Sequence, residues 1–186
     1  VMHLEFAGAV ASRSFADPEI MQETLGVYFL RCVEILGRYG GVISTSSAQA
    51  LTAIFGYPRS YDDSAERAVR ASLAVADAVA DLAAEHGVRV GVATGVVVVS
   101  ESADETARVD VVGQAPVLAV DLAKIADPNT VVVAESTWSE ISRLFVGKAL
   151  DRSKMGAWHV VKPGKSASRF YGRQSDAPLP MIGRID

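Results

Sequence analysis

The residues best suited to bind a ligand lie close together in one stretch, residues 40–56. Hydroxyl and amide side chains follow one another there, at Ser44, Thr45, Ser46, Ser47 and Gln49. Groups of this kind donate and accept hydrogen bonds, and they could line a polar pocket. A tip of small polar residues is more often simply a turn between two strands. Two interpretations of this stretch therefore stay open, a ligand pocket and a structural hairpin.

Other residues with chemical potential are more isolated. His3, His86 and His159 lack the spacing of metal ligands, which predicts surface histidines or hydrogen-bonded core histidines. Cys32 lies on the apolar stripe of a predicted helix and is expected in the core. The string PGKS at residues 163–166 ends like a phosphate-binding loop, but the leading glycine that this motif needs falls at His159. We therefore expect a plain loop there.

Length and composition indicate one packed domain. The chain has 186 residues, of which 49% are hydrophobic and 22% are charged. Its net charge of −4 gives no attraction to nucleic acid or to an anionic membrane, and no apolar run is long enough to span a bilayer. The single cysteine excludes an intrachain disulfide, and we expect a cytoplasmic protein.

Two long amphipathic helices are predicted on either side of the polar stretch. The first starts at residues 17–19, where an acid precedes a proline, and runs to Gly40. The second starts at Asp62 or Asp63 and runs to about Glu85. Residues 40–56 between them should form a strand–turn–strand hairpin in the middle of a sheet that both helices cover.

The remaining pattern predicts an α+β fold. Residues 1–11 form a first strand and residues 88–99 a long or bent one, so the first six elements follow a ferredoxin-like βαββαβ order. Helices should lie on one face of a mainly antiparallel sheet. The further elements expected are a strand at 109–112, a helix at 117–126, a strand at 130–134, a short helix capped by Ser136, and terminal strands at 145–150, 157–161 and 169–171.

The end of the chain differs in composition. Residues 1–173 are expected to form the domain, and residues 174–186 a linker toward a downstream module. The string PMIGR at residues 180–184 resembles the lead-in to an ATPase module. The abrupt start in a strand suggests an excised domain.

Seven strings resemble the class III adenylyl/guanylyl cyclase catalytic domain, in that family's order over residues 6–171. They are FAGAV at 6–10, DPE at 17–19, AIFG at 53–56, DDSAERAVRASL at 62–73, RVGVATG at 89–95, VVGQ at 111–114 and DPNTVVVAESTW at 127–138. The resemblance implies the class III cyclase fold, in which the βαββαβ core is extended by further strands and helices. It also implies a dimer that shares its active sites across the interface.

The resemblance places four binding positions on this chain. Family members hold two metal ions, Mg or Mn, on the nucleotide triphosphate with two aspartates. These positions correspond to Gly8, which offers no ligand, and to Gln49, whose neutral amide poorly replaces a carboxylate on a hard cation. The lysine that reads the purine corresponds to Thr45, and the second purine-reading position corresponds to Asp110, which is retained in type. Asp110 and Thr45 are thus the candidate nucleotide-binding residues.

Two further family residues stabilise the transition state, an asparagine and an arginine. They correspond to Val117, which cannot hydrogen-bond, and to Asp121, which reverses the charge. Losing one such donor costs roughly 3–4 kcal/mol of transition-state stabilisation. We therefore expect no catalytic residue and no metal ligand at these positions, and no cofactor unless Mg or Mn serves a surviving activity.

Three hypotheses follow. The leading one is a catalytically degenerate cyclase homology domain with a regulatory or dimerisation role in intracellular signalling, as a homodimer or paired with another cyclase domain. The second is an active adenylyl cyclase that forms cAMP from ATP with a partner's residues. The third is a sensor that binds ATP or GTP through Asp110 and the serine-rich hairpin without turnover. Cyclic nucleotide formed with manganese would establish the second, and loss of binding after Asp110→Ala would favour the third.

Overall fold

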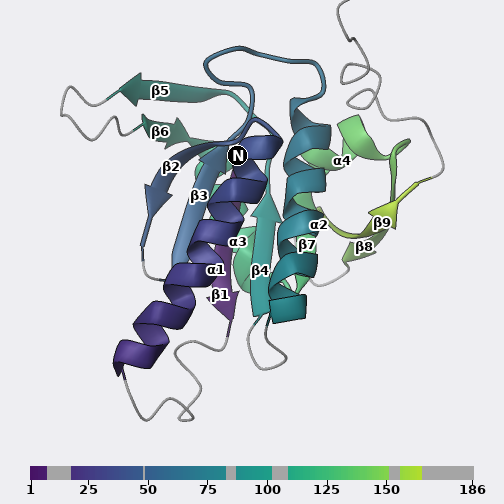
Figure 1. Cartoon of the computed structure of the whole chain (residues 1–186). Helices are drawn as coiled ribbons and strands as arrows, with labels where there is room; N and C mark the ends of the chain where they lie inside the picture. Colours follow the sequence, from purple (N-terminus) through teal and green to yellow (C-terminus); the bar gives the residue numbers. More distant parts are fainter. Residues whose placement is uncertain (8–17, 48, 83–86, 102–108, 151–155, 165–186) are drawn as a thin grey trace, which may run out of the picture.

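The computed structural model describes residues 1–7, 18–47, 49–82, 87–101, 109–150 and 156–164. Figure 1 shows how the elements are arranged. In chain order they are β1 (Met2–Ala7), α1 (Pro18–Arg38), β2 (Val42–Ser46), β3 (Ala50–Ile54), α2 (Ser64–Leu82), β4 (Gly87–Val92), β5 (Val97–Glu101), β6 (Val109–Gly113), α3 (Gln114–Ile125), β7 (Thr130–Ala134), α4 (Glu135–Ile141), β8 (Phe145–Leu150) and β9 (Ala157–Pro163).

Seven of the strands form one mixed sheet in the order β2-β3-β1-β4-β7-β9-β8. Only β4 and β7 pair in parallel, and the other pairs in this sheet are antiparallel. The predicted α+β class and the βαββαβ order of the first six elements are confirmed.

The polar hairpin lies at one end of the sheet, which corrects the prediction that it sits in the middle. β2 is an edge strand, and β3 joins the hairpin to β1. β1 takes the inner position because it pairs with β3 on one side and with β4 on the other. The edge position leaves Thr45 and Ser46 of β2 exposed.

Helices cover both faces of the sheet, not one face as the sequence predicted. α1 and α2 pack side by side on the first face, over Leu4, Val90 and Val133 (Figure 1). α3 packs on the opposite face, where Ala119 and Leu122 contact residues such as Val132. Side chains alternate between the faces along β7, because a strand has a period of two residues. The prediction of helices on one face was wrong because β7 is apolar on both sides, so its sequence does not show which side a helix covers.

Gly91 of β4 makes the close approach of α3 possible. A Cβ atom at this position would lie 2.0 Å from the carbonyl oxygen of Ala119 and 2.6 Å from the amide nitrogen of Ala123. Both are backbone atoms of α3, so neither can move without moving the helix. The absence of a side chain at Gly91 therefore sets how closely α3 packs on the sheet.

The predicted strand at residues 88–99 is two strands in different sheets. β4 ends at Val92, and β5 pairs with β6 in a separate two-stranded ribbon. The link between β4 and β5 is held by α4: the Ser136 hydroxyl donates to the Thr94 carbonyl at 2.8 Å, and the Thr94 and Thr137 hydroxyls lie 3.0 Å apart. Ser136 therefore anchors this link instead of capping α4, whose N-cap is Ala134.

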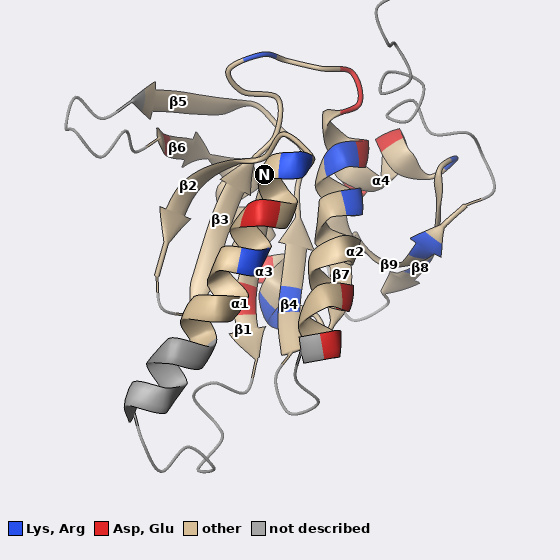
Figure 2. Cartoon of the chain, viewed as in Figure 1, with Lys and Arg blue, Asp and Glu red and all other residues tan. Residues whose placement is uncertain are grey.

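Two buried ion pairs fix the start of α2. Arg67 binds Asp63 through two nitrogen–oxygen contacts of 3.0 and 3.1 Å, and Arg70 Nε lies 2.8 Å from Glu66 Oε1. Figure 2 shows where the charged residues of α1 and α2 fall along the two helices. None of the described helices is long and apolar enough to cross a bilayer.

Cys32 is fully buried in the core, as predicted, and burial raises the pKa of its thiol to about 12. Several predictions lie outside the described residues. These are the N-cap at Asp17, the family position at Gly8, the strand at 169–171, and the linker at 174–186. The predicted helix itself begins at Pro18, as expected.

Candidate functional site

The structure brings the end of β1 beside the start of β3. The Phe6 amide donates a hydrogen bond to the Gln49 carbonyl at 2.8 Å, and Glu5 pairs in register with Ala50. Gly8 follows Phe6 by two residues and lies outside the described part of the chain. The exposed residue Gln49 is therefore placed beside the described end of β1.

The side chains at this place do not fit a divalent metal ion. Mg²⁺ and Mn²⁺ prefer carboxylate oxygens, whereas Gly8 has no side chain and Gln49 offers one neutral amide. Glu5 is the acid nearest to this hairpin along β1, and its carboxylate lies 3.5 Å from His3 Nε2. The described residues contain no group of three or more potential metal ligands.

A row of polar residues runs across β2, β3 and β1, from the exposed Thr45 to the buried Thr52 and His3. Thr45 of β2 is opposite Thr52 of β3, and Thr52 is opposite His3 of β1. The Thr52 hydroxyl lies 2.8 Å from His3 Nδ1. Burial lowers the pKa of His3 below its ordinary value, although the Glu5 carboxylate acts in the other direction. Thr45 therefore contributes a hydroxyl, without the charge of a lysine, to a row that is neutral near pH 7.

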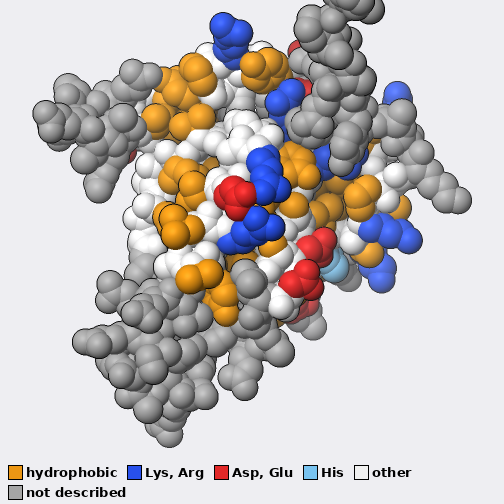
Figure 3. Space-filling model, in the orientation of Figure 1, with side chains coloured by type: hydrophobic (Ala, Val, Ile, Leu, Met, Phe, Trp, Pro, Cys, Tyr) orange, Lys and Arg blue, Asp and Glu red, His pale blue; other side chains and the backbone are white. Residues whose placement is uncertain are grey.

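Asp110 lies on β6, directly opposite Ser100 of β5, and its side chain is exposed. β6 contacts β2, so the two candidate nucleotide-binding residues, Asp110 and Thr45, lie on neighbouring strands. Within the described residues no hydrogen bond or ion pair is formed by either side chain. Hydrophobic side chains gather over the β5–β6 ribbon in the space-filling view (Figure 3).

Val117 and Asp121 lie one turn apart on α3, because residues i and i+4 share a helix face. The Val117 side chain is 63% exposed. Asp121 Oδ1 accepts a hydrogen bond from Lys124 Nζ at 3.1 Å, and both side chains of this pair are exposed. An apolar group and a paired carboxylate therefore occupy the face on which the sequence comparison placed an asparagine and an arginine.

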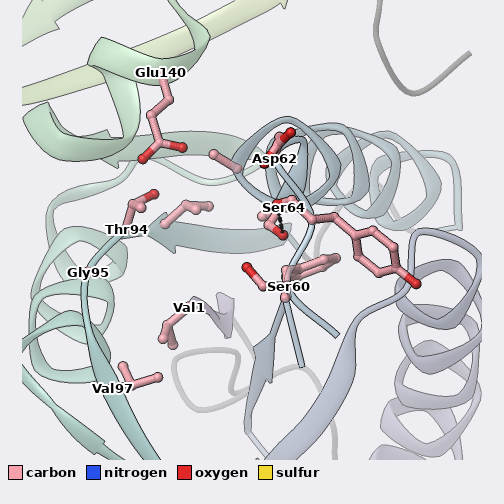
Figure 4. A pocket seen from close by; sticks show the side chains of 14 residues that line it. Val1, Ser60, Asp62, Ser64, Thr94, Gly95, Val97 and Glu140 are labelled. Atoms are coloured by element: carbon pink, nitrogen blue, oxygen red, sulfur yellow. Dashed lines mark hydrogen bonds between the residues drawn. The ribbon is translucent and has the colours of Figure 1, made fainter. Parts of the chain in front are cut away.

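A cavity of about 400 Å³ lies near the other end of β1, and the sequence did not indicate it. The loop after β3 contributes Ser60, the first residue of α2 contributes Ser64, the link after β4 contributes Thr94, and α4 contributes Glu140. Figure 4 shows these side chains around the cavity, with the Glu140 carboxylate directed toward Thr94. The family positions at Thr45, Gln49, Asp110, Val117 and Asp121 do not line it.

Solved structures with this fold are cyclase domains. The guanylyl cyclase domain of the RhoGC fusion protein from the aquatic fungus Blastocladiella emersonii superposes with a TM-score of 0.81 at 20% identity, over 88% of this chain and 95% of that chain. The guanylate cyclase domain of RhGC from Catenaria anguillulae, solved in complex with GTP, gives 0.78 at 20% identity, over 88% and 95%. The adenylyl cyclase CyaB from P. aeruginosa gives 0.76 at 19% identity, over 90% and 95%.

At these identities the superpositions establish the fold alone. We found no match among curated protein sequences. The family model of the adenylate and guanylate cyclase catalytic domain matches residues 16–171, a range that begins after Gly8 and includes the other five family positions. The chain belongs to the adenylate and guanylate cyclase catalytic domain family.

Proposed function

We propose that this chain is a catalytically silent cyclase homology domain, which acts in signalling by associating with another cyclase domain. The observation that carries the proposal is the side-chain chemistry of the site. Gln49 stands beside β1 where a metal carboxylate is needed, and Val117 and Asp121 stand on α3 where hydrogen-bond donors are needed.

The residues at the two metal-binding positions lack the negative charge that a divalent ion needs. A divalent ion on a triphosphate needs anionic oxygen ligands, and the two positions supply one neutral amide and no side chain. Without the ion, the ribose hydroxyl is not activated and the leaving pyrophosphate is not neutralised.

The residues at the two transition-state positions lack hydrogen-bond donors. Each lost donor of this kind lowers the rate by about two to three decades. Val117 offers no hydrogen bond, and the carboxylate of Asp121 repels a phosphate. The ion pair with Lys124 weakens that repulsion, but the Asp121 carboxylate still cannot donate a hydrogen bond to a phosphate.

A partner does not easily repair both losses. In a shared site one domain supplies the metal ligands and the other supplies the purine and transition-state residues. This chain supplies neither complete set, whichever role it takes. We infer that the domain was retained for its fold and its surface, with a homodimer or a pair with another cyclase domain as the functional unit.

One observation favours nucleotide sensing as a second candidate function. Asp110 and Thr45 lie on the neighbouring strands β6 and β2, and both are exposed. A hydroxyl and a carboxylate can both form hydrogen bonds to a purine edge without any metal. This candidate requires binding without turnover.

Calorimetric titration with non-hydrolysable analogues of ATP and of GTP, with and without Mn²⁺, tests the proposal. A silent association domain gives no heat in any of the four conditions. Heat without Mn²⁺ that disappears in Asp110→Ala would establish the sensor instead. Heat that requires Mn²⁺ would overturn the proposal, because it would mean that this chain holds a metal–nucleotide complex.

A further inference from the structure

We propose that the cavity near the start of β1 is a binding site for an aliphatic amine, a ligand with a positively charged ammonium group on an apolar chain. The family positions do not line this cavity, so the proposal goes beyond catalytic silence and association. The volume of about 400 Å³ is within the usual range of small-molecule sites. The lining combines an apolar floor with an acidic rim.

The floor of the cavity is apolar and buried. It contains Ala65 and Ala68 of α2 and Val92 at the end of β4, which are 7%, 2% and 1% exposed. Ala65 and Ala68 are three residues apart, so they share one face of the helix. Their side chains are single methyl groups, which leaves space beside them. An aliphatic chain bound over this floor removes apolar surface of both molecules from water, which favours binding.

The rim of the cavity is polar. Ser60, Asp62 and Glu140 line it and are exposed, and Thr94 is half-buried. In Figure 4, Glu140 and Thr94 lie on one side of the cavity and Ser60 lies on the other. Within the described residues, the side chains of Ser60, Asp62 and Glu140 form no hydrogen bond or ion pair. Their oxygen atoms are therefore available to a ligand.

Charge selects a cation as that ligand. The described residues that line the cavity include two acids, Asp62 and Glu140, and no lysine, arginine or histidine. Val1 also lines it, and burial lowers the pKa of its amino group to about 6, although Glu140 acts in the other direction. Arg67 of α2 does not line the cavity and is bound to Asp63. The two carboxylates therefore repel an anion such as a nucleotide and attract a cation.

An organic amine fits this lining better than a metal ion does. Hard divalent ions take six or more oxygen ligands, and the described residues contain no group of three or more potential metal ligands. An ammonium group has hydrogen-bond donors and no acceptor, so it can donate to the Glu140 carboxylate and to the hydroxyls of Thr94 and Ser60. Asp62 offers a second carboxylate to a diamine. Only an organic cation also uses the apolar floor.

Calorimetric titration with the diamine putrescine, at low ionic strength and near pH 7.5, tests the proposal. We expect a Kd in the millimolar range or tighter. Glu140→Gln should weaken binding by about tenfold or more, because the ammonium group loses a charged acceptor. Asp62→Asn should weaken binding in the same direction. Amide chemical shifts in nuclear magnetic resonance should change at residues 92–97 and 136–141, and stay unchanged at Thr45 and Asp110.

Two controls separate this site from general attraction to a negatively charged chain. Asp77→Asn also removes one exposed carboxylate, but Asp77 of α2 does not line the cavity, so putrescine binding should stay unchanged. The diol of the same chain length replaces both amines with hydroxyls and should bind at least about tenfold more weakly. Circular dichroism checks that each variant is folded.

Three results would overturn the proposal. The first is no binding of putrescine to the parent chain. The second is equal binding to the parent chain, Glu140→Gln and Asp62→Asn, which would mean that the rim carboxylates do not hold the amine. The third is binding of the diol as tight as that of putrescine, because a neutral ligand would then suffice. Turnover of ATP or GTP has no bearing on this site, so its failure and that of catalytic silence are distinguishable.

Discussion

The Phe6 amide donates a hydrogen bond to the Gln49 carbonyl at 2.8 Å, and this contact joins the end of β1 to the start of β3. Main-chain atoms alone form this contact, so it places Gln49 beside β1 whatever side chain stands at position 49. The sequence provides no carboxylate at Gly8 or at Gln49. Substitutions that add carboxylates there test whether the two positions can form a metal site.

We predict that the double variant Gly8→Asp/Gln49→Asp gains Mn²⁺-dependent binding of a non-hydrolysable ATP analogue. Two carboxylates supply the anionic oxygens that a hard divalent ion prefers. The variant should bind the analogue at least about tenfold more tightly with Mn²⁺ than without it, which is roughly 1.4 kcal/mol in calorimetry. Turnover should remain undetected, because Val117 and Asp121 are unchanged.

The control is Gly8→Asn/Gln49→Asn, which has side chains of the same size without charge. It should bind no better with Mn²⁺ than the parent chain does. If the aspartate and asparagine variants behave alike, the main-chain arrangement around Phe6 and Gln49 does not form a metal site.

Gly91→Ala is predicted to destabilise the fold strongly. The new Cβ would lie 2.0 Å from the Ala119 carbonyl oxygen, so α3 must move away from the sheet. Overpacking of this kind commonly costs about 1–3 kcal/mol of unfolding free energy. Urea denaturation followed by circular dichroism measures the loss.

Gly37→Ala serves as the control, because a Cβ at Gly37 in α1 meets no atom within 4 Å. Alanine inside a helix should raise the unfolding free energy by about 0.5–1 kcal/mol relative to glycine. Equal destabilisation by both substitutions would show that α3 does not pack on Gly91 as described.

His3 is predicted to make the stability of the fold depend on pH below about 6.5. Burial lowers the pKa of His3 from its ordinary value of 6.5, so the unfolded chain binds a proton more readily than the folded one. The contribution of neutral His3 is fully present above pH 6.5 and is lost as the pH falls from there toward the lowered pKa. Unfolding free energies measured at a series of pH values should therefore decline over this range.

His3→Gln removes the titration while keeping groups that hydrogen-bond to Thr52. The difference in unfolding free energy between the parent chain and this variant isolates the histidine from other titrating groups. A difference that does not change between pH 7.5 and pH 5 would contradict the account of His3.

The order of elements could be predicted from the sequence because each helix has its own start signal and apolar stripe. Cys32 and Leu36 fell on the buried face of α1 as their spacing required. The position of the polar hairpin could not be predicted, since it depends on which strands β1 pairs with. Local patterns contain no information about that choice.

The two-sided cover of the sheet was missed for a related reason. Val131, Val132 and Val133 form one apolar run. Such a run does not indicate that alternate residues pack against helices on different faces of the sheet. Gly91 was a usable signal, because a glycine inside a strand often marks a close backbone approach. The break after Val92 depends on contacts from Ser136 and Thr137, more than 40 residues later.

The roles of the candidate site residues stay predictions. The resemblance placed Thr45, Gln49, Asp110, Val117 and Asp121 by sequence position, and the structure gives their surroundings. It could not show that Lys124 pairs with Asp121, or that Thr45 stands in a row with Thr52 and His3. These relations need the helix and the sheet in three dimensions.

The measurement that tests catalytic silence most directly is cyclic nucleotide formation by the purified chain. ATP and GTP are each incubated with Mn²⁺ and a high concentration of the chain, and cAMP and cGMP are determined by mass spectrometry beside an active cyclase domain. The account predicts no more product than in buffer alone. Product that rises with the concentration of this chain, requires Mn²⁺ and is lost in Gln49→Ala would contradict it.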